Sequence, residues 1–347
     1  MSAWLPTAPC TPGDCVTVAG PRAGLPRRVL RLAACLAVLA AGLLAVPLVR
    51  ALAWLPTERL VRCWARLLLA ALGVRARALA VPGPARGRGR DWGRGWKWTR
   101  GRDRAAGGSL VVANHVSWLD ILLVASVRPG RMLAKTEVGR WPVLGPLTSW
   151  GGTILLDRDR LRALPGTVDE IAAALRAGGR VVVFPEGSTW CGHGGGRFRP
   201  ALFEAAVRAD APVQPLVLRY RTPDGRPSTA PAFVGEDGLL ASMWRVVSVR
   251  ALTAEVEFLP QLPPALFPSR RHLAAAAQRV VDRRRHPDGT SGTRACPGCT
   301  HPVEGPVRVP GEDRAPATTA LRVPHRSGTA TPAPSPTPPA VPVRAGR

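Results

Sequence analysis

An alternation of strand-like and helix-like segments over residues 108–262 constrains the fold of this chain more than any other feature. The candidate strands are 109–114, 131–135, 152–156, 180–185, 213–219 and 252–258. The candidate helices are 118–126, 137–149, 160–177, 199–209 and 238–247, followed by one at 269–285. Such alternation predicts an α/β fold, in which a mostly parallel central sheet is covered by helices.

Four charged or titratable residues follow the carboxyl ends of predicted strands. They are His115, Lys135, Arg158 and Glu186. In an open parallel sheet, ligands bind beyond the carboxyl ends of the strands. The sequence therefore predicts a functional site at that edge of the sheet.

The segment "NHVSWLD", residues 114–120, admits two interpretations. Ser117 and Asp120 have the spacing of a capping box, which would leave His115 without a role. Alternatively, the turn before the helix lets Asp120 hold one ring nitrogen of His115. That contact would fix the tautomer and make the other nitrogen a better base. The spacing alone leaves both interpretations open.

The charged residues at the other strand ends also admit two interpretations each. In "VFPEGS", Pro185 ends a strand and Gly187 permits a sharp turn, so Glu186 is either a site residue or a turn glutamate. Arg158 could clamp a phosphate, or it could be one of the chain's 46 arginines. Lys135 is one of only two lysines.

The N-terminal part of the chain contains 18 successive uncharged residues, 32–49, flanked by arginines. As a helix this run would be about 27 Å long, close to the hydrocarbon thickness of a bilayer. A membrane-inserted helix is predicted, with a buried soluble helix or a signal segment as alternatives. In 58–74, arginines share one helical face, as in an interfacial helix or one docked on the domain. We expect 27–80 to form membrane-associated helices.

The flanking segments have the composition of unstructured chain. We expect disorder at 1–26 and 286–347, a basic Gly/Arg/Trp loop at 81–107, and a folded domain at 108–285. The net charge of +25 implies an anionic partner, either nucleic acid or a membrane surface. Basic residues among tryptophans suit both partners. Beside a membrane helix we favour lipid and expect no nucleic acid.

The seven cysteines show no disulfide framework, which favours a reducing compartment. The pair Cys296 and Cys299 lacks the partner pair that structural zinc normally needs. Cys191 and His193 lack an evident orienting group for a thiol nucleophile. We therefore expect no metal and no cofactor.

Four segments together resemble the glycerolipid acyltransferases, the family that includes 1-acyl-sn-glycerol-3-phosphate acyltransferase. "NHVSWLD" resembles that family's H-x4-D motif, "GGTILLDR" its second block, and "VFPEGS" its third. "APVQPLVLRY", with Pro215, resembles the fourth. The segments occur in the family's order across residues 108–262.

The resemblance implies a general-base mechanism without metal or covalent acyl-enzyme. His115 would take the proton of the acceptor hydroxyl, and Asp120 would orient it. The hydroxyl would attack the thioester of acyl-CoA or acyl-carrier protein. Arg158, Glu186, Gly187 and Ser188 would shape the acceptor site, with Lys135 as a second phosphate contact.

The third block departs from the family pattern at one position. The family commonly has an arginine after F-P-E-G-T, whereas Trp190 stands at that position here. Arg197 or Arg199 could replace it. The expected acceptor is 1-acyl-sn-glycerol-3-phosphate, giving phosphatidic acid, with another lyso-lipid such as lyso-ornithine lipid as the alternative. The expected location is the cell membrane, with the catalytic domain on the cytoplasmic side.

Overall fold

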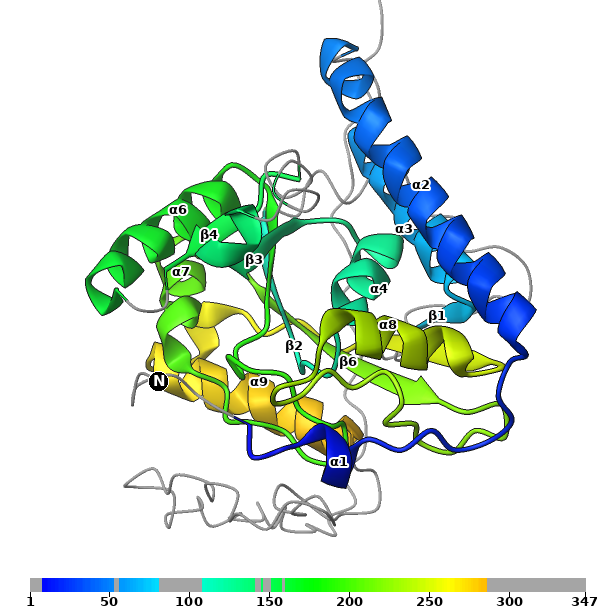
Figure 1. The fold of residues 1–347 in the computed structure, drawn as a ribbon. Helices are drawn as coiled ribbons and strands as arrows, with labels where there is room; N and C mark the ends of the chain where they lie inside the picture. The colour runs from blue at the N-terminus through cyan, green and yellow to red at the C-terminus, as the bar shows by residue number, and fades with distance from the viewer. Residues whose placement is uncertain are drawn as a thin grey trace, which may run out of the picture. The chain divides into compact units, whose positions relative to one another are not determined.

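The chain folds around a single mixed sheet, as seen in a computed structural model (Figure 1). The structure describes residues 8–52, 56–80, 108–140, 145, 151–157 and 160–285. The strands are β1 (Val74–Ala80), β2 (Ser109–Ala113), β3 (Arg131–Lys135), β4 (Ile154–Leu156), β5 (Arg180–Val183), β6 (Val213–Arg221) and β7 (Leu252–Phe258). Their order is β1-β7-β6-β2-β5-β3-β4. The strands β6, β2, β5, β3 and β4 are parallel to one another, and β7 is antiparallel to β6. The predicted α/β fold with a mostly parallel sheet is confirmed.

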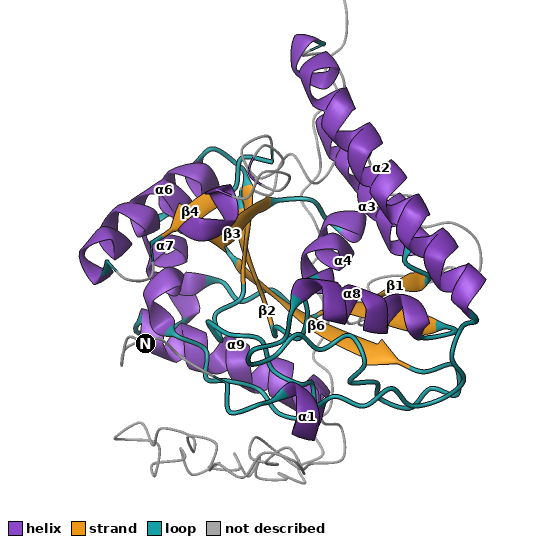
Figure 2. Ribbon diagram, in the orientation of Figure 1, coloured by secondary structure: helices purple, strands orange, loops and turns teal. Residues whose placement is uncertain are grey.

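Helices cover both faces of the sheet (Figure 2). The helices are α1 (Pro12–Cys15), α2 (Leu25–Ala51), α3 (Thr57–Ala71), α4 (Leu119–Val127), α6 (Leu164–Arg176), α7 (Phe203–Arg208), α8 (Leu239–Ser248) and α9 (Arg270–Arg285). Short 3₁₀ turns are η1 (Thr136–Arg140), η2 (Leu161–Ala163), η3 (Pro200–Leu202) and η4 (Pro264–Leu266).

Two apolar cores lie on opposite faces of the sheet because side chains alternate along each strand. In β2, Val111 packs in a core with α3, α4 and α8, whereas Val112 packs in a core with α6, α7 and α9. All five residues of β2 are buried, as in a strand covered on both faces. The strand therefore holds the turn that follows it in a rigid position.

Two boundary predictions are wrong. Residues 74–80 are not part of a helical segment, because β1 pairs in parallel with β7 and extends the sheet. Residues 8–24 are not disordered, because Cys10, Cys15 and Ala23 are buried and the Thr17 amide donates to Thr229 Oγ1 at 2.9 Å. The Thr17 contact is to a residue 212 positions away, so the local composition of 1–26 gives no sign of it. The predicted loop at 81–107 and tail at 286–347 lie outside the described residues.

The apolar N-terminal segment forms α2, which lies beside α3 (Figure 1). Trp64 Nε1 of α3 donates to Val38 O of α2 at 2.9 Å. Gly42 lets this indole approach, because a Cβ there would lie 2.2 Å from Nε1. Over Leu25–Val49, α2 is long and apolar enough to cross a membrane, and its most apolar 18-residue window has a mean hydropathy of 2.6.

Candidate active site

The parallel half of the sheet brings the predicted strand-end residues to one edge. β2, β5 and β3 are neighbours, so their carboxyl ends lie side by side. His115 follows β2, Glu186 follows β5 and Lys135 ends β3. Asn114 joins the end of β2 to β6, since its side chain donates to Leu218 O at 3.0 Å and accepts from the Leu218 amide at 2.8 Å. The turn containing His115 is thus anchored on both sides.

His115 and Asp120 are in direct contact. His115 Nδ1 lies 2.8 Å from Asp120 Oδ2. A carboxylate can only accept, so the proton is on Nδ1 and the lone pair of neutral His115 is on Nε2. The ring stacks on Phe184, with centroids 4.0 Å apart and planes 12° apart. The His115 side chain is 18% exposed, whereas that of Asp120 is fully buried. This arrangement presents a fixed base from a rigid support.

Four donors hold the Asp120 carboxylate in place. Besides the imidazole, Oδ2 accepts from the amides of Val116 at 2.6 Å and Ser117 at 2.9 Å. Ser117 Oγ accepts in turn from the Leu119 amide at 3.2 Å, so the side chains of Ser117 and Asp120 each accept from a backbone amide at the start of α4. Tyr220 donates its hydroxyl to Oδ1 at 2.6 Å. The capping interpretation and the histidine–carboxylate interpretation therefore describe one and the same structure.

Glu186 contacts the backbone of His115 from the interior of the domain rather than facing the surface where a substrate would bind. It is 2% exposed, and its Oε2 accepts from the His115 amide at 2.9 Å. Its Oε1 accepts from Arg285 Nη2 at 3.0 Å. Burial raises the pKa of Glu186 to about 7, while Arg285 and the His115 amide oppose that rise. This geometry favours a positioning role for Glu186 over a substrate contact.

The guanidinium beside Glu186 comes from the end of α9. Arg285 has a side chain only 5% exposed. Arg197 and Arg199, the expected substitutes for the family's arginine, are exposed. The backbone amide of Arg199 donates to Pro185 O at 2.9 Å. Within the described residues, the charge partner of Glu186 is therefore Arg285, 99 positions along the chain.

The remaining predicted residues surround this centre. Lys135 is exposed at the end of β3, and Ser188 is half-buried in the turn after β5. Gly187 has a φ of 74°, where a side chain would strain the backbone. Arg158 lies outside the described residues. Lys135 and Ser188 are thus available at the edge that holds His115.

Sequence reasoning missed Tyr220 and Arg285. Tyr220 is the chain's only tyrosine, 100 residues from Asp120, and it lies in the segment that resembles the family's fourth block. Arg285 ends a run of three arginines that had the pattern of a solvated helix end. For Tyr220, the only signal in the sequence is that it is the single tyrosine of the chain. For Arg285, nothing in the local sequence distinguishes it from the neighbouring arginines.

Tyr220→Phe is expected to lower kcat with little change in KM, because it removes a hydrogen bond to the carboxylate that orients His115. A hydrogen bond to a charged group contributes about 1.5–3 kcal/mol, so a drop in kcat of roughly tenfold or more is expected. Ser242→Ala is the control, since Ser242 is also buried and accepts from Trp118 Nε1 at 3.1 Å, away from Asp120. Equal loss of kcat in both variants would contradict a positioning role for Tyr220.

Glu186 predicts a pH dependence of stability. Its folded-state pKa is about 7 and its ordinary value is 4.5, so the native state binds more protons between these values. The free energy of unfolding should therefore fall as pH rises from about 4.5 to 7. Glu186→Gln should lack this component, which is roughly 3 kcal/mol. Denaturant titrations at several pH values measure it, with exposed Glu236→Gln as control. A wild-type profile retained in Glu186→Gln would contradict the assignment.

Comparison with known proteins identifies the domain. Residues 99–219 match the family model described as Acyltransferase. The chain has an acyltransferase-family domain. It is 38% identical over 152 residues to the 1-acyl-sn-glycerol-3-phosphate acyltransferase of Neisseria gonorrhoeae, covering 44% of this chain and 59% of that protein. It is 34% identical over 178 residues to the lyso-ornithine lipid O-acyltransferase of Pseudomonas aeruginosa, covering 50% of this chain and 66% of that protein.

A solved structure has a similar fold over 76% of this chain. It is the 1-acyl-sn-glycerophosphate (LPA) acyltransferase of Thermotoga maritima, with a TM-score of 0.51. Sequence identity is 18%, and the alignment covers 76% of this chain and 98% of the other. The resemblance to glycerolipid acyltransferases is therefore confirmed. The two curated relatives are matched over about three fifths to two thirds of their length.

Proposed function

We propose that the protein transfers a fatty acyl group from acyl-CoA or acyl-carrier protein to the free hydroxyl of a lyso-lipid. The observation that supports this most is the buried Asp120 carboxylate fixed on Nδ1 of a partly exposed His115, within an acyltransferase-family domain. A base positioned in this way typically contributes about 10²–10⁴-fold in rate.

The geometry supports direct transfer in one displacement. Nε2 of His115 takes the proton of the acceptor hydroxyl as its oxygen attacks the thioester carbonyl. The carbon–sulfur bond then breaks, and the thiol leaves with the proton that His115 returns. Asp120 stabilises the transient imidazolium while it remains ionised itself. No step requires a metal or an acyl-enzyme.

The acceptor proposed first is 1-acyl-sn-glycerol-3-phosphate, giving phosphatidic acid. Lys135 and Arg158, each at or just after the end of a strand, are the proposed phosphate contacts. The similarity to lyso-ornithine lipid O-acyltransferases specifically favours lyso-ornithine lipid as the second candidate, whose headgroup has no phosphate.

A panel of acceptors with purified full-length protein distinguishes these candidates. We expect the highest kcat/KM with 1-acyl-sn-glycerol-3-phosphate, and we expect Arg158→Ala to raise its KM with little effect on kcat. Arg162→Ala, a nearby arginine on η2, is the control. Preference for lyso-ornithine lipid, with KM unchanged in Arg158→Ala, would transfer the proposal to the second acceptor.

We propose further that α2 places the protein in the cell membrane. Large apolar side chains remain exposed along it at Leu25, Val29, Leu36, Leu44 and Leu48. Their spacing is four to eight residues, which keeps them near one side of the helix. In the most apolar 18-residue window of α2, 6% is buried. In a bilayer, hydrocarbon would cover these apolar side chains, which would otherwise be in contact with water.

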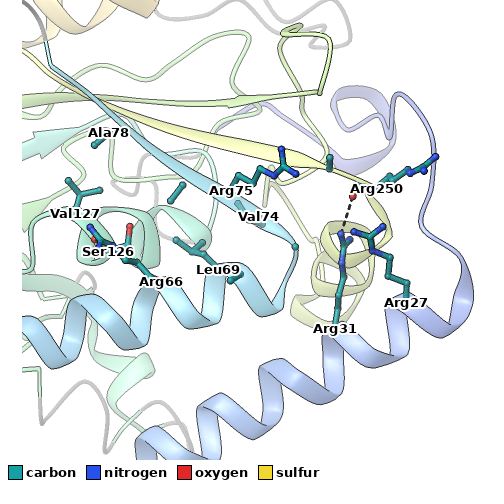
Figure 3. Close-up of a pocket in the computed structure, with 14 residues that line it drawn as sticks. Arg27, Arg31, Arg66, Leu69, Val74, Arg75, Ala78, Ser126, Val127 and Arg250 are labelled. Atoms are coloured by element: carbon teal, nitrogen blue, oxygen red, sulfur yellow. Dashed lines mark hydrogen bonds between the residues drawn. The ribbon is translucent and has the colours of Figure 1, made fainter. Parts of the chain in front are cut away.

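A basic pocket at the start of α2 supports an orientation toward an anionic leaflet (Figure 3). Its volume is about 750 Å³. Its charged lining residues are Arg27, Arg31, Arg66, Arg75 and Arg250. Arg31 is held by carbonyl oxygens, including that of Arg250 at 3.0 Å. Arginines beside a membrane helix favour the cytoplasmic side and anionic headgroups.

Membrane fractionation tests this placement. We expect the protein in the membrane fraction, and vesicle binding that strengthens with anionic lipid and weakens when Arg75 and Arg250 are replaced by Ser. Recovery in the soluble fraction, with tight and salt-sensitive binding to nucleic acid, would overturn the membrane proposal in favour of a nucleic-acid partner.

A further inference from the structure

Three buried cysteines from distant parts of the chain meet beside the active-site turn. Cys10 precedes α1, Cys15 is the last residue of α1, and Cys191 lies in the loop that follows Glu186. Their exposed fractions are 2%, 4% and 0%. All three Sγ atoms lie within 4.8 Å of one another. The cluster thus brings the N-terminal segment next to the loop that follows Glu186, although the two are about 180 residues apart in the sequence.

The spacing of these sulfurs suits a small thiophilic cation. Zinc–thiolate bonds are about 2.3 Å long, so three sulfurs in a tetrahedral site lie roughly 3.8 Å apart. The cluster therefore needs a contraction of no more than about 1 Å to bind the ion. Side-chain rotations suffice for such a change. A disulfide would use only two of the three thiols, so disulfide formation alone would not account for the cluster.

We infer that Cys10, Cys15 and Cys191 form a zinc site that fastens the N-terminal segment over the active-site loop. Binding releases three thiol protons and leaves three thiolates on Zn²⁺. Within the described residues, no further Cys, His, Asp or Glu joins the group, which leaves the fourth position of a tetrahedral site open to a water molecule. This site departs from our expectation of a metal-free protein, because Cys10 and Cys15 are distant from Cys191 in the sequence and meet it only in the fold.

The location gives the ion a structural role in the active site. Trp190, next to Cys191, donates its amide to His115 O at 2.8 Å. The N-terminal segment, dark blue in Figure 1, also contacts the segment that precedes α8, where the Thr17 amide donates to Thr229 Oγ1. There the Cβ of any residue replacing Gly235 would lie 3.0 Å from Cys10 O. An ion that holds α1 against Cys191 therefore restrains the backbone at His115.

Cysteines also pack as small apolar side chains, and the experiment separates that role from metal binding. Full-length protein is purified under reducing conditions from zinc-supplemented cells, and its zinc content is measured by elemental analysis. We expect about one zinc per chain, and less than about a fifth of that in Cys10→Ala, Cys15→Ala or Cys191→Ala. Alanine retains the apolar packing, so these variants should fold.

Two control variants locate the ion. Cys63→Ala removes an exposed cysteine elsewhere and should retain the zinc. A variant lacking both Cys296 and Cys299 should retain it as well. Zinc lost from that double variant, but kept in Cys10→Ala, would overturn the assignment to this cluster.

Two further measurements do not depend on activity. Co²⁺ added to zinc-free wild type should produce thiolate-to-cobalt charge-transfer absorption, which Cys191→Ala should lack. A strong chelator should lower the Tm of wild type but not that of Cys10→Ala. Metal-free wild type with no cobalt spectrum and no effect of the chelator would overturn the proposal. So would a disulfide between any two of the three cysteines, detected by mass spectrometry.

Discussion

His115→Ala is expected to lower kcat for acyl transfer by about 10²–10⁴-fold, because it removes the base that Asp120 orients at the sheet edge. The change should leave the fold intact, since the side chain is 18% exposed and its main structural contact is a stack on Phe184. Steady-state kinetics with each acyl donor, beside thermal unfolding, measure both effects.

The control for this variant is the other histidine near the site. His193 is exposed in the loop after Cys191, and His193→Ala should retain near wild-type kcat. A His115→Ala enzyme with wild-type kcat would remove the proposed mechanism. Activity lost equally in both variants would indicate damage to the loop rather than loss of a base.

Arg285→Met is expected to destabilise the protein by about 3–5 kcal/mol, the usual cost of removing one partner from a buried ion pair. It leaves Glu186 buried without its cation, so the carboxyl should be protonated well above pH 7. Since Glu186 also accepts from the His115 amide, kcat should fall along with the stability. Denaturant titration gives the first quantity and initial rates give the second.

The double variant Glu186→Gln/Arg285→Met tests the pairing itself. It removes both charges, so it should be more stable than Arg285→Met alone. Arg283→Met, an exposed neighbour on α9, should change the free energy of unfolding by less than about 0.5 kcal/mol. Additive losses in the double variant would show that Glu186 and Arg285 do not depend on each other.

Much of the fold could be predicted because its signals are local. Each parallel strand is a short apolar run bounded by turn residues, and strand ends such as those before His115 and Glu186 meet at one edge by topology alone. β1 was missed because "VRARALA" follows a helix directly, with only Gly73 marking the break. Its strand character comes from pairing with β7, 178 residues away.

The buried contacts of the candidate site could not be predicted, because they too join residues that are far apart in the sequence. Asp120 and His115 are five residues apart, so their contact was one of the two interpretations that the spacing allowed. Tyr220 and Arg285 reach the site from β6 and α9 through tertiary packing, which a single sequence does not display. The burial that raises the pKa of Glu186 is likewise a property of the assembled fold, whereas the sequence left open whether this residue belongs to the site or to a turn.

The most direct test of the central claim is acyl transfer by the purified full-length protein. The wild type is incubated with acyl-CoA or acyl-carrier protein and a mixture of lyso-lipids, and the diacylated products are followed by mass spectrometry. We predict one acyl group added to a free hydroxyl of a lyso-lipid, with release of one equivalent of thiol and no reaction in His115→Ala. Absence of any acylated product with every donor and acceptor, from a folded wild-type protein, would contradict the account.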